Sequence, residues 1–282
     1  MRVIAMILTF KPVVTTAFSA ILLALSSHNT YADQLDKIKD RGRIIIGIKN
    51  DYKPFGFLGS DGKLQGFEID LAKYIGKEIT GSEEKIELVP VVASNRIELL
   101  NQGRIDIIVA TLGRTEERAK VLDYGDNYYM LGEGAIVAPV NSKLKNRDKL
   151  KGAKLCGMLG NSFNRVLTEK YGAELVLFQG SAELFKAFQD NRCDGIGFDE
   201  PILQQKISEP AWQGKYEIAI PADSFIPIAI GVRKGETALR DAANKAIEHA
   251  AAEGVLTSAA ERFNMGKSQF LEDQQAKAKL AK

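Results

Sequence analysis

The sequence is poor in cysteine and histidine and carries little net charge. Its 282 residues include two cysteines and two histidines, and 38 Lys and Arg against 36 Asp and Glu give a formal charge of +2. This balance provides no basic field for a nucleic acid. His28 falls in the N-terminal segment that we expect to be removed, which leaves His249 as the only histidine. A zinc site of cysteine and histidine ligands is therefore not expected, and the sequence predicts no metal and no cofactor.

Long apolar runs are absent beyond the N-terminus. There, Arg2 and Lys11 precede an uncharged run at Pro12–Ser27 and small residues at the positions that a signal peptidase reads, the last of them Ala32. We expect residues 1–32 to be a cleaved signal peptide, which leaves a formally neutral chain of 250 residues. No later run reaches the roughly 18 apolar residues of a membrane span, and no cysteine stands at the cleavage point for a lipid anchor. The mature chain is predicted to diffuse freely in a periplasm.

The two cysteines, Cys156 and Cys193, fit an oxidising compartment. Each lies in a strand-like run, KLCGML or CDGIGF. A disulfide between them is one interpretation. Two buried thiols are the other, because a free cysteine packs like a small hydrophobic residue.

From residue 33 onward, short apolar runs alternate with amphipathic stretches, which predicts an α/β architecture. RIIIGI at Arg43–Ile48 is the first predicted strand. After it, Phe67, Leu71, Ile75 and Ile79 recur every four residues, which is the buried stripe of a helix. Further strands of the same sheet are predicted at Ile86–Val91 and Ile105–Ala110, with a short helix between them that ends at Gly103.

The pattern repeats in a second block, which indicates one large domain or two small lobes. The predicted strands of this block are Ala153–Met158, Glu174–Phe178 and Gly195–Phe198, and its predicted helices are Ser162–Tyr171 and Ala182–Asp190. A strand at Pro227–Val232, a long helix at Glu236–Gly254 and a shorter helix up to Asn264 follow. The remaining segment, Gly266–Lys282, is polar and is predicted to be a frayed tail.

Five motifs, in this order and spacing, resemble the bacterial extracellular solute-binding proteins of family 3, which serve ABC transporters for polar amino acids. They are DQLDKIKDRGRIIIGIKNDYKPFGF, GKLQGFEIDLA, NRIELLNQGRIDIIVATLGRTEERAKVLDYGDNYY, GNSFN and CDGIGFDE, and the match spans about residues 33–264. Members that bind aspartate or glutamate are the nearest in character. The resemblance implies an α/β chain with the type II periplasmic-binding-protein fold, in which a two-strand hinge joins two lobes. Lobe 1 would comprise residues 33–137 and 229–265, lobe 2 residues 138–228, and residues 266–282 a polar C-terminal tail.

A receptor for a free amino acid needs a cation for the α-carboxylate and an acid for the α-ammonium on opposed walls of a cleft. Arg118 lies in the first turn of a helix that Thr115 opens as a cap. Its planar guanidinium can hold both carboxylate oxygens, and the family places its carboxylate-binding arginine here. A surface arginine that pairs with Glu116 or Glu117 is the alternative.

Five further contacts are expected around the ligand. Thr111 can add a hydroxyl, and Gly113 adds only a backbone N–H where many relatives carry Ser or Thr. Asn161 and Ser162 stand at the start of a predicted helix, whose free N–H groups would form an anion site; simple helix capping by either residue is the other interpretation and is compatible with that role. Asp199 ends the CDGIGFD strand, where the family has the acid that pairs with the α-ammonium, although an Asp at this position can also cap the next turn.

Specificity is expected from the groups that meet the ligand side chain. Lys49 ends the first strand, where receptors for basic amino acids tend to carry an aspartate, and Arg96 opens the helix before the third strand. Two cations there favour a second carboxylate on the ligand, as in glutamate or aspartate, and reject cationic ligands. The alternatives are that Lys49 is solvated and that Arg96 braces Asp106 or the helix. Tyr52 is expected to form an apolar wall of the cleft, unless it belongs to the core.

These expectations describe binding without chemistry, so the chain is not expected to be an enzyme. Contacts to a ligand from both lobes favour closure, and an ABC transporter permease in the inner membrane would recognise the closed monomer. One alternative is a prephenate-type dehydratase on the same fold, with Arg118, Lys49 and either Glu200 or Asp199 around a diacid. The other is a ligand-sensing adaptor.

Overall fold

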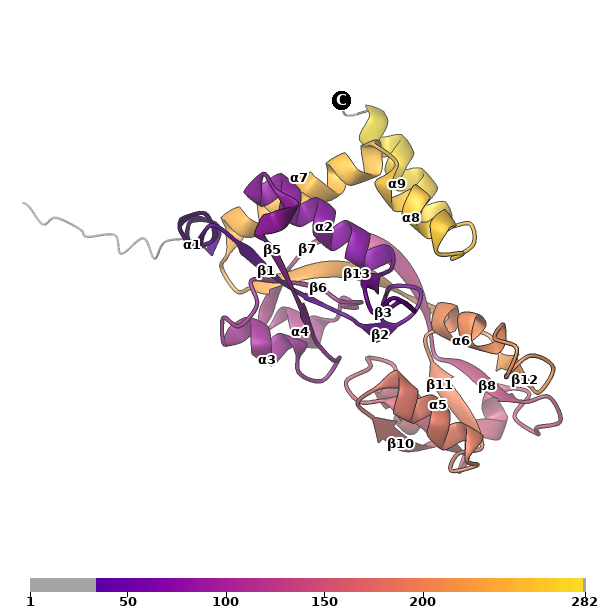
Figure 1. Cartoon of the computed structure of the whole chain (residues 1–282). Coiled ribbons are helices and arrows are strands. Elements are labelled where there is room, and N and C mark those ends of the chain that lie inside the picture. Colours follow the sequence, from indigo (N-terminus) through magenta and orange to yellow (C-terminus); the bar gives the residue numbers. More distant parts are fainter. Residues whose placement is uncertain (1–33, 281–282) are drawn as a thin grey trace, which may run out of the picture. The chain divides into compact units, whose positions relative to one another are not determined.

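The computed structural model describes residues 34–280, whose strands form two five-stranded sheets and one three-stranded sheet (Figure 1). The predicted signal peptide lies outside the described residues. The first sheet has the order β5-β1-β6-β13-β7, with bounds Ile86–Pro90, Ile44–Ile48, Ile107–Val109, Ser224–Arg233 and Leu122–Glu133. The second sheet has the order β10-β9-β11-β8-β12, with bounds Glu174–Phe178, Lys154–Met158, Gly195–Phe198, Ala135–Pro139 and Tyr216–Ile220. The small sheet joins β2, β3 and β4, at Asp51–Tyr52, Gly56–Leu58 and Leu64–Gln65.

The two larger sheets share one plan. In the first, β1 pairs in parallel with β5 and β6, and β13 pairs antiparallel with β6 and β7. In the second, β9 pairs in parallel with β10 and β11, and β8 pairs antiparallel with β11 and β12. Apart from Lys154 at the start of β9, the central parallel strands are apolar, as expected for sheets that helices cover on both faces. The predicted limits of the two lobes remain predictions, because strand pairing defines sheets and not domains.

The helices follow the predicted apolar stripes. In α2, Phe67, Leu71 and Ile75 are fully buried, and the helix ends at Gly81 in the left-handed conformation. The α-helices of the described chain are α1 Gln34–Arg41, α2 Phe67–Thr80, α3 Arg96–Asn101, α4 Glu116–Ala119, α5 Ser181–Gln189, α6 Glu200–Ile207, α7 Thr237–Ala252, α8 Val255–Arg262 and α9 Gln269–Leu280. Short 3-10 helices occur at Glu83–Lys85 and Arg147–Leu150. None of these helices has both the length and the apolar character of a membrane span.

The chain passes between the two larger sheets twice, at the ends of β7 and β13. These strands pair over their full length, until Glu133 lies opposite Ser224. The first passage is Gly134, directly before β8, and the second is the short segment 221–223 after β12. Gly134 has a φ of +69°, and a Cβ on it would lie 1.8 Å from the ring of Phe163. Only glycine therefore fits this passage without strain.

The second sheet carries a disulfide between Cys156 on β9 and Cys193, two residues before β11. Their Cα atoms are 5.6 Å apart, which is a normal separation for a disulfide. The predicted bond is confirmed, and the alternative of two buried thiols is wrong. It closes a loop with a sequence separation of 37. A loop of this length corresponds to a stabilisation of about 4 kcal/mol in the chain-entropy model.

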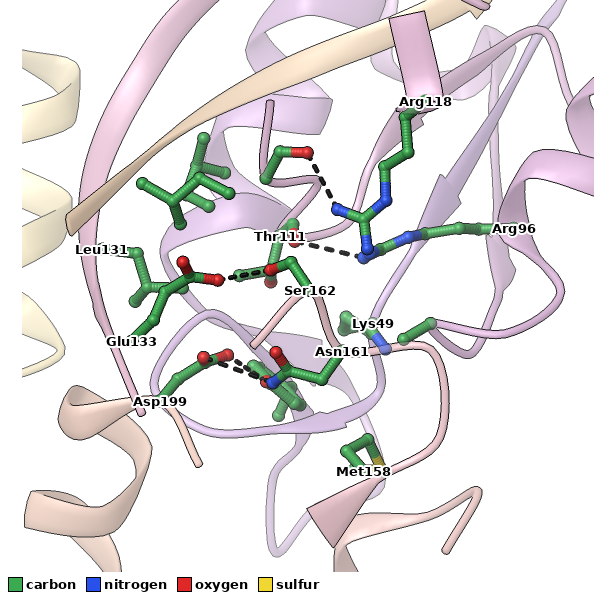
Figure 2. A pocket seen from close by; sticks show the side chains of 15 residues that line it. Lys49, Arg96, Thr111, Arg118, Leu131, Glu133, Met158, Asn161, Ser162 and Asp199 are labelled. Carbon is green, nitrogen blue, oxygen red and sulfur yellow. Dashed lines mark hydrogen bonds between the residues drawn. The ribbon is translucent and has the colours of Figure 1, made fainter. Parts of the chain in front are cut away.

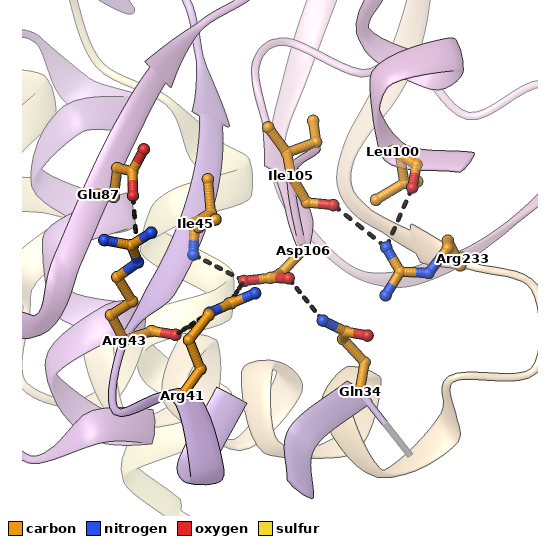
Figure 3. Close-up of polar contacts among 9 residues, drawn as sticks. All are labelled: Gln34, Arg41, Arg43, Ile45, Glu87, Leu100, Ile105, Asp106 and Arg233. Carbon is orange, nitrogen blue, oxygen red and sulfur yellow. Dashed lines mark hydrogen bonds and ion pairs between the residues drawn. The ribbon is translucent and has the colours of Figure 1, made fainter. Parts of the chain in front are cut away.

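The first sheet is held at one end by a polar cluster around Asp106 (Figure 3). The buried Asp106 carboxylate accepts hydrogen bonds from the Gln34 amide and the Ile45 backbone N–H, each at 2.7 Å, and pairs with Arg41. Arg96 makes its hydrogen bonds elsewhere. The alternative that Arg96 braces Asp106 is therefore wrong.

Two predicted segments differ from the structure. The C-terminal segment Gly266–Lys282 was expected to fray, but it contains α9, which packs against α7 and buries Leu271 and Ala278. Residues seven positions apart share one helix face, so these two side chains are enough to seat a largely polar helix. The helix predicted at Ser162–Tyr171 is irregular, with one short turn followed by a π-helix at Val166–Lys170.

Candidate functional site

All nine residues that the sequence analysis selected line one pocket, to which chain segments of both larger sheets contribute (Figure 2). The predicted lining residues are Lys49, Tyr52, Arg96, Thr111, Gly113, Arg118, Asn161, Ser162 and Asp199. The others are Ala93, Leu131, Glu133, Met158, Ile226 and Ile228. The cavity volume is about 20 Å³, room for roughly one water molecule. The walls of the pocket therefore lie almost in contact.

Arg118 bridges the walls of this pocket. It lies on α4, where the Thr115 hydroxyl accepts a hydrogen bond from the Arg118 N–H at 3.2 Å, as predicted for a capping threonine. Its guanidinium donates to the carbonyl oxygen of Gly113 at 2.8 Å and to that of Gly160, in the loop after β9, at 2.9 Å. No carboxylate pairs with Arg118 within residues 34–280, so the alternative of a pair with a neighbouring glutamate is wrong. The guanidinium is held only by neutral acceptors, which an anion could displace.

Two further cations, Lys49 and Arg96, are buried in the same pocket, with exposures of 2% and 3%. Burial, and then the charge of Arg96, lower the pKa of Lys49 to about 7. Burial, and then the charge of Arg118, lower the pKa of Arg96 to about 10. Arg96 donates to the carbonyl oxygens of Ala110 and Thr111, and its Nε has no partner among the described residues. The predicted alternative of a solvated Lys49 is wrong, and a nearby anion would stabilise both charges.

Thr111 is held by an acid that the sequence analysis missed. The Thr111 backbone N–H and hydroxyl both donate to the carboxylate of Glu68, at 2.6 and 2.9 Å, and the Tyr128 hydroxyl donates to the same carboxylate at 2.7 Å. Thr111 has a φ of +52°, which is strained for a residue with a branched side chain. Burial raises the pKa of Glu68, and the three hydrogen bonds oppose this shift. Since the Thr111 hydroxyl proton is taken, its oxygen can only accept from a ligand.

Asp199 faces the cations from the second sheet, directly after β11. Its carboxylate accepts a hydrogen bond from the Tyr52 hydroxyl at 2.5 Å and a longer one from the Asn161 amide at 3.4 Å. Its side chain does not cap α6, so the alternative of a simple capping role is wrong. Burial raises the pKa of Asp199, and the hydrogen bond from Tyr52 opposes this shift. The pocket thus has a basic side and an acidic side, which suits a zwitterion.

Comparison with known proteins identifies the family. Residues 44–266 match the model of the bacterial extracellular solute-binding proteins, family 3. The chain belongs to this family. It is 33% identical to the ABC transporter glutamine-binding protein GlnH of Bacillus subtilis over 87% of this chain and 93% of that protein. It is 27% identical to the L-glutamate/L-aspartate-binding protein of Pseudomonas aeruginosa over 84% of this chain and 82% of that protein.

A solved structure supports the same assignment. The solute receptor for L-cysteine of Neisseria gonorrhoeae has a TM-score of 0.76 and 31% identity, over 81% of this chain and 92% of that chain. The predicted family and the type II periplasmic-binding-protein fold, with two α/β lobes joined by two strands, are confirmed. The names of these relatives differ in the ligand, so similarity does not decide which member of the ligand class this family member binds.

Asn161 and Ser162 line the pocket, but the regular helix start expected at them is not formed. The Asn161 side-chain oxygen accepts a hydrogen bond from the Phe163 N–H at 3.0 Å, which is the capping alternative. The Ser162 hydroxyl donates to Glu133. The following helix is short and irregular, so the regular helix predicted at Ser162–Tyr171 is wrong, whereas the role of Asn161 and Ser162 in binding an anion stays a prediction.

Glu133 is the second acid that the sequence analysis missed. It ends β7 and lines the pocket, where burial and then the charge of Asp199 raise its pKa, while the hydrogen bond from Ser162 and the charge of Arg118 oppose this. The signal was present, because Glu133 is an isolated acid after the apolar run Tyr128–Gly132. An acid that follows a buried strand points to a site at the end of that strand.

Gly113 has a packing reason to lack a side chain. A Cβ on Gly113 would lie 2.6 Å from the Cδ1 atom of Ile226. The space that a serine or threonine would take is therefore filled by Ile226 from β13. Gly113 also contributes a carbonyl oxygen that Arg118 and Tyr124 share, and the expected contact of its backbone N–H with a ligand stays a prediction.

Proposed function

We propose that this chain is a periplasmic receptor that captures one free amino acid between its two walls and delivers it to the permease of an ABC transporter. The observation that carries the proposal is that Arg118 and Asp199, two side chains of opposite charge, line the same pocket. Asp199 is buried and Arg118 is partly buried. The relatives support the class, since their names specify glutamine, glutamate or aspartate, and cysteine.

Each charged group of the backbone of an amino acid has a partner in this arrangement. The α-carboxylate would replace the carbonyl oxygen of Gly160 at the Arg118 guanidinium and form a bidentate pair. The α-ammonium would bind Asp199, whose carboxylate is already oriented by Tyr52 and Asn161. An amino acid is larger than the present cavity, so the walls must separate to admit it and close again around it.

The charges of the pocket favour an acidic ligand. Lys49, Arg96 and Arg118 oppose two lining carboxylates, Glu133 and Asp199, so one cation is left without a lining counter-charge. A carboxylate on the ligand side chain would neutralise it, whereas the ammonium of a lysine ligand would be repelled. Glutamate or aspartate is therefore the proposed ligand, and glutamine and cysteine are the neutral competitors to test.

A thermal-shift panel of the common amino acids tests this proposal on protein that has been unfolded, stripped of ligand and refolded. A ligand at 100 times its Kd adds about 2.7 kcal/mol to the free energy of unfolding. We expect glutamate or aspartate to give the largest shift, and Arg118→Ala to abolish it. The matched control is Lys120→Ala, which removes an exposed cation directly after α4.

Each part of the proposal has its own contrary outcome. Stabilisation by lysine or arginine, with none by glutamate or aspartate, would refute the acidic ligand. A silent panel would refute the amino-acid class, and dehydration of prephenate by the same protein would then establish the enzymatic alternative. Recovery of the mature chain from the cytoplasm, or as a stable oligomer, would contradict the proposed periplasmic monomer.

A further inference from the structure

The C-terminal helix α9 lies beyond residue 266, where the match to the family model ends. It contacts both α7 and the long strand β7 of the first sheet. Leu271 and Ala278 are buried in that contact, with exposures of 2% and 7%. Figure 1 shows α9 beside α7 and α8 at the C-terminal end of the described chain. This helix therefore adds a support to β7 that the family segment alone does not include.

Helix α9 contacts β7 at an irregularity in the pairing of the first sheet. Tyr129 lies opposite Ile228 and Asn127 lies opposite Ala229, so Tyr128 is an extra residue on β7, as in a β-bulge. The bulge places two adjacent tyrosines, Tyr128 and Tyr129, in the core, with exposures of 0% and 5%. In a regular strand, neighbouring side chains would point to opposite faces.

Three hydrogen bonds from outside the sheet hold the bulge. The Gln274 amide on α9 donates to the carbonyl oxygen of Asn127 at 2.9 Å. The Arg114 guanidinium donates to the Asn127 side-chain oxygen at 3.1 Å, and the Asp126 N–H donates to Asn244 on α7 at 2.7 Å. Gln274 is the member of this set that lies on α9. Its own side-chain oxygen is buried without a partner among the described residues.

The extra residue of the bulge, Tyr128, is connected to the pocket through Glu68. The Tyr128 hydroxyl donates to the Glu68 oxygen that also accepts the Thr111 N–H. Thr111 in turn lines the pocket in its left-handed conformation. A continuous series of contacts thus connects Gln274, the bulge, Tyr128, Glu68 and Thr111.

We propose that Gln274 is a positioning residue that fixes the β7 bulge and, through Tyr128 and Glu68, sets the geometry of Thr111 and thereby the affinity for the ligand. The proposal rests on the proposed function for its effect on binding. It assigns to α9 a role in ligand affinity, which a helix that only caps the end of the fold would not have.

The test compares wild type, Gln274→Ala, Tyr128→Phe and the double variant by calorimetric titration with L-glutamate, L-glutamine and L-cysteine. We expect Gln274→Ala to weaken binding of the best of these ligands by roughly three- to tenfold, the usual range for one hydrogen bond. The double variant should be no weaker than Tyr128→Phe alone, because both changes act on one series of contacts. Gln269→Ala is the matched control on α9, since within residues 34–280 its side-chain amide donates only to Asp273 of the same helix.

A second measurement does not need a ligand. Hydrogen exchange of the Thr111 backbone N–H in the unliganded protein should be faster in Gln274→Ala and unchanged in Gln269→Ala. If exchange at Thr111 responds while no amino acid binds wild type, the proposed function fails and the coupling stands. If wild type binds an amino acid but Gln274→Ala matches it in affinity and in exchange at Thr111, the coupling is refuted. Effects of Gln274→Ala and Tyr128→Phe that simply multiply would also overturn it.

Discussion

The first and second sheets have the same strand plan, but they are held together by different chemistry. In the first, a buried carboxylate at Asp106 connects the N-terminal helix to the strands through hydrogen bonds and an ion pair (Figure 3). In the second, the disulfide between Cys156 and Cys193 connects β9 to the segment just before β11 by a covalent bond. The plan of a sheet therefore does not dictate how it is stabilised, and each sheet is open to a different kind of disruption.

The same contrast continues at the pocket. The chain that builds the first sheet supplies the cations Lys49, Arg96 and Arg118 together with one acid, Glu133 at the end of β7, whereas the loop after β11 supplies only the acid Asp199 among the charged lining residues. In both sheets the charged groups follow the ends of strands, where α/β proteins bind ligands. Shared topology thus fixes where a ligand can bind, and the residue types at the strand ends fix which charges it must carry.

The largest expected effect is on the covalent support of the second sheet. Replacing both cysteines, Cys156→Ser with Cys193→Ser, should lower the free energy of unfolding by about 4 kcal/mol, because the unfolded chain regains the entropy of the open loop. Urea unfolding monitored by circular dichroism measures this loss. Adding a reductant should destabilise wild type and leave the double variant unchanged. A loss below about 1 kcal/mol would show that packing, and not the bond, stabilises this sheet.

The second prediction separates the basic wall from the acidic wall. Asp199→Asn should weaken glutamate binding by about 3 kcal/mol, the usual cost of removing one partner of a desolvated charge pair. Arg118→Lys keeps the charge but loses the planar fork that can hold both carboxylate oxygens, so it should weaken glutamate binding by about 2 kcal/mol. Glutarate, which lacks the α-ammonium, should be weakened by Arg118→Lys and little affected by Asp199→Asn. Calorimetric titration of both ligands measures this pattern. Equal losses of affinity for both ligands in both variants would mean that Arg118 and Asp199 do not bind separate groups of the ligand, as the proposal requires.

The third prediction uses the titration of Lys49, whose pKa is lowered to about 7. A ligand carboxylate beside Lys49 favours the charged ammonium, so binding takes up a proton above pH 7 and affinity falls as the pH rises through 7. The charged groups that act on Lys49 are Arg96, Asp51, Glu68 and Asp199. Glutamine, which lacks the second carboxylate, provides the reference for titrations of these other groups.

The ratio of glutamate affinity to glutamine affinity should fall about tenfold from pH 7 to pH 9. In Lys49→Met the ratio should stay flat over the same interval. In the unliganded protein, the lowered pKa of Lys49 makes the free energy of unfolding change with pH in the opposite direction to the affinity. Between about pH 7 and 10.5 the unfolded chain binds more protons at this group than the folded chain, so the contribution of Lys49 to stability rises with pH there. A ratio that is flat in wild type would remove Lys49 from the specificity site.

The strands could be predicted because apolar runs of strand length are a local pattern. Thr111 directly follows the third predicted strand, whereas Arg118 and Asp199 were predicted because the family that the sequence resembles has its carboxylate-binding arginine and its ammonium-binding acid at these positions. Glu68 was missed because an acid in the first turn of a helix is ordinarily a solvated partner of the helix dipole. Its burial depends on the packing of Tyr128 and Thr111, which lie far from it in the chain.

The C-terminal helix was missed for a related reason. The segment after Gly266 has little apolar character, and polar composition alone predicts a frayed end. In the structure α9 packs against α7 and buries Leu271 and Ala278. The helix is therefore stabilised by tertiary packing and not by the helix propensity of its own sequence. A seven-residue spacing of two small or apolar residues is too common to be a signal by itself.

The smallest expected effect concerns Gly113, on the basic side of the pocket. A Cβ there would collide with the end of the Ile226 side chain, which is flexible and can be shortened. We expect Gly113→Ser combined with Ile226→Ala to tighten glutamate binding by about threefold, because the new hydroxyl can donate to the ligand carboxylate while the loss of Ile226 packing offsets part of that gain. Titration of the double variant against Ile226→Ala alone isolates the hydroxyl. Weaker binding in that comparison would mean that the carbonyl oxygen of Gly113, which holds Arg118, matters more to the basic wall than any side chain added beside it.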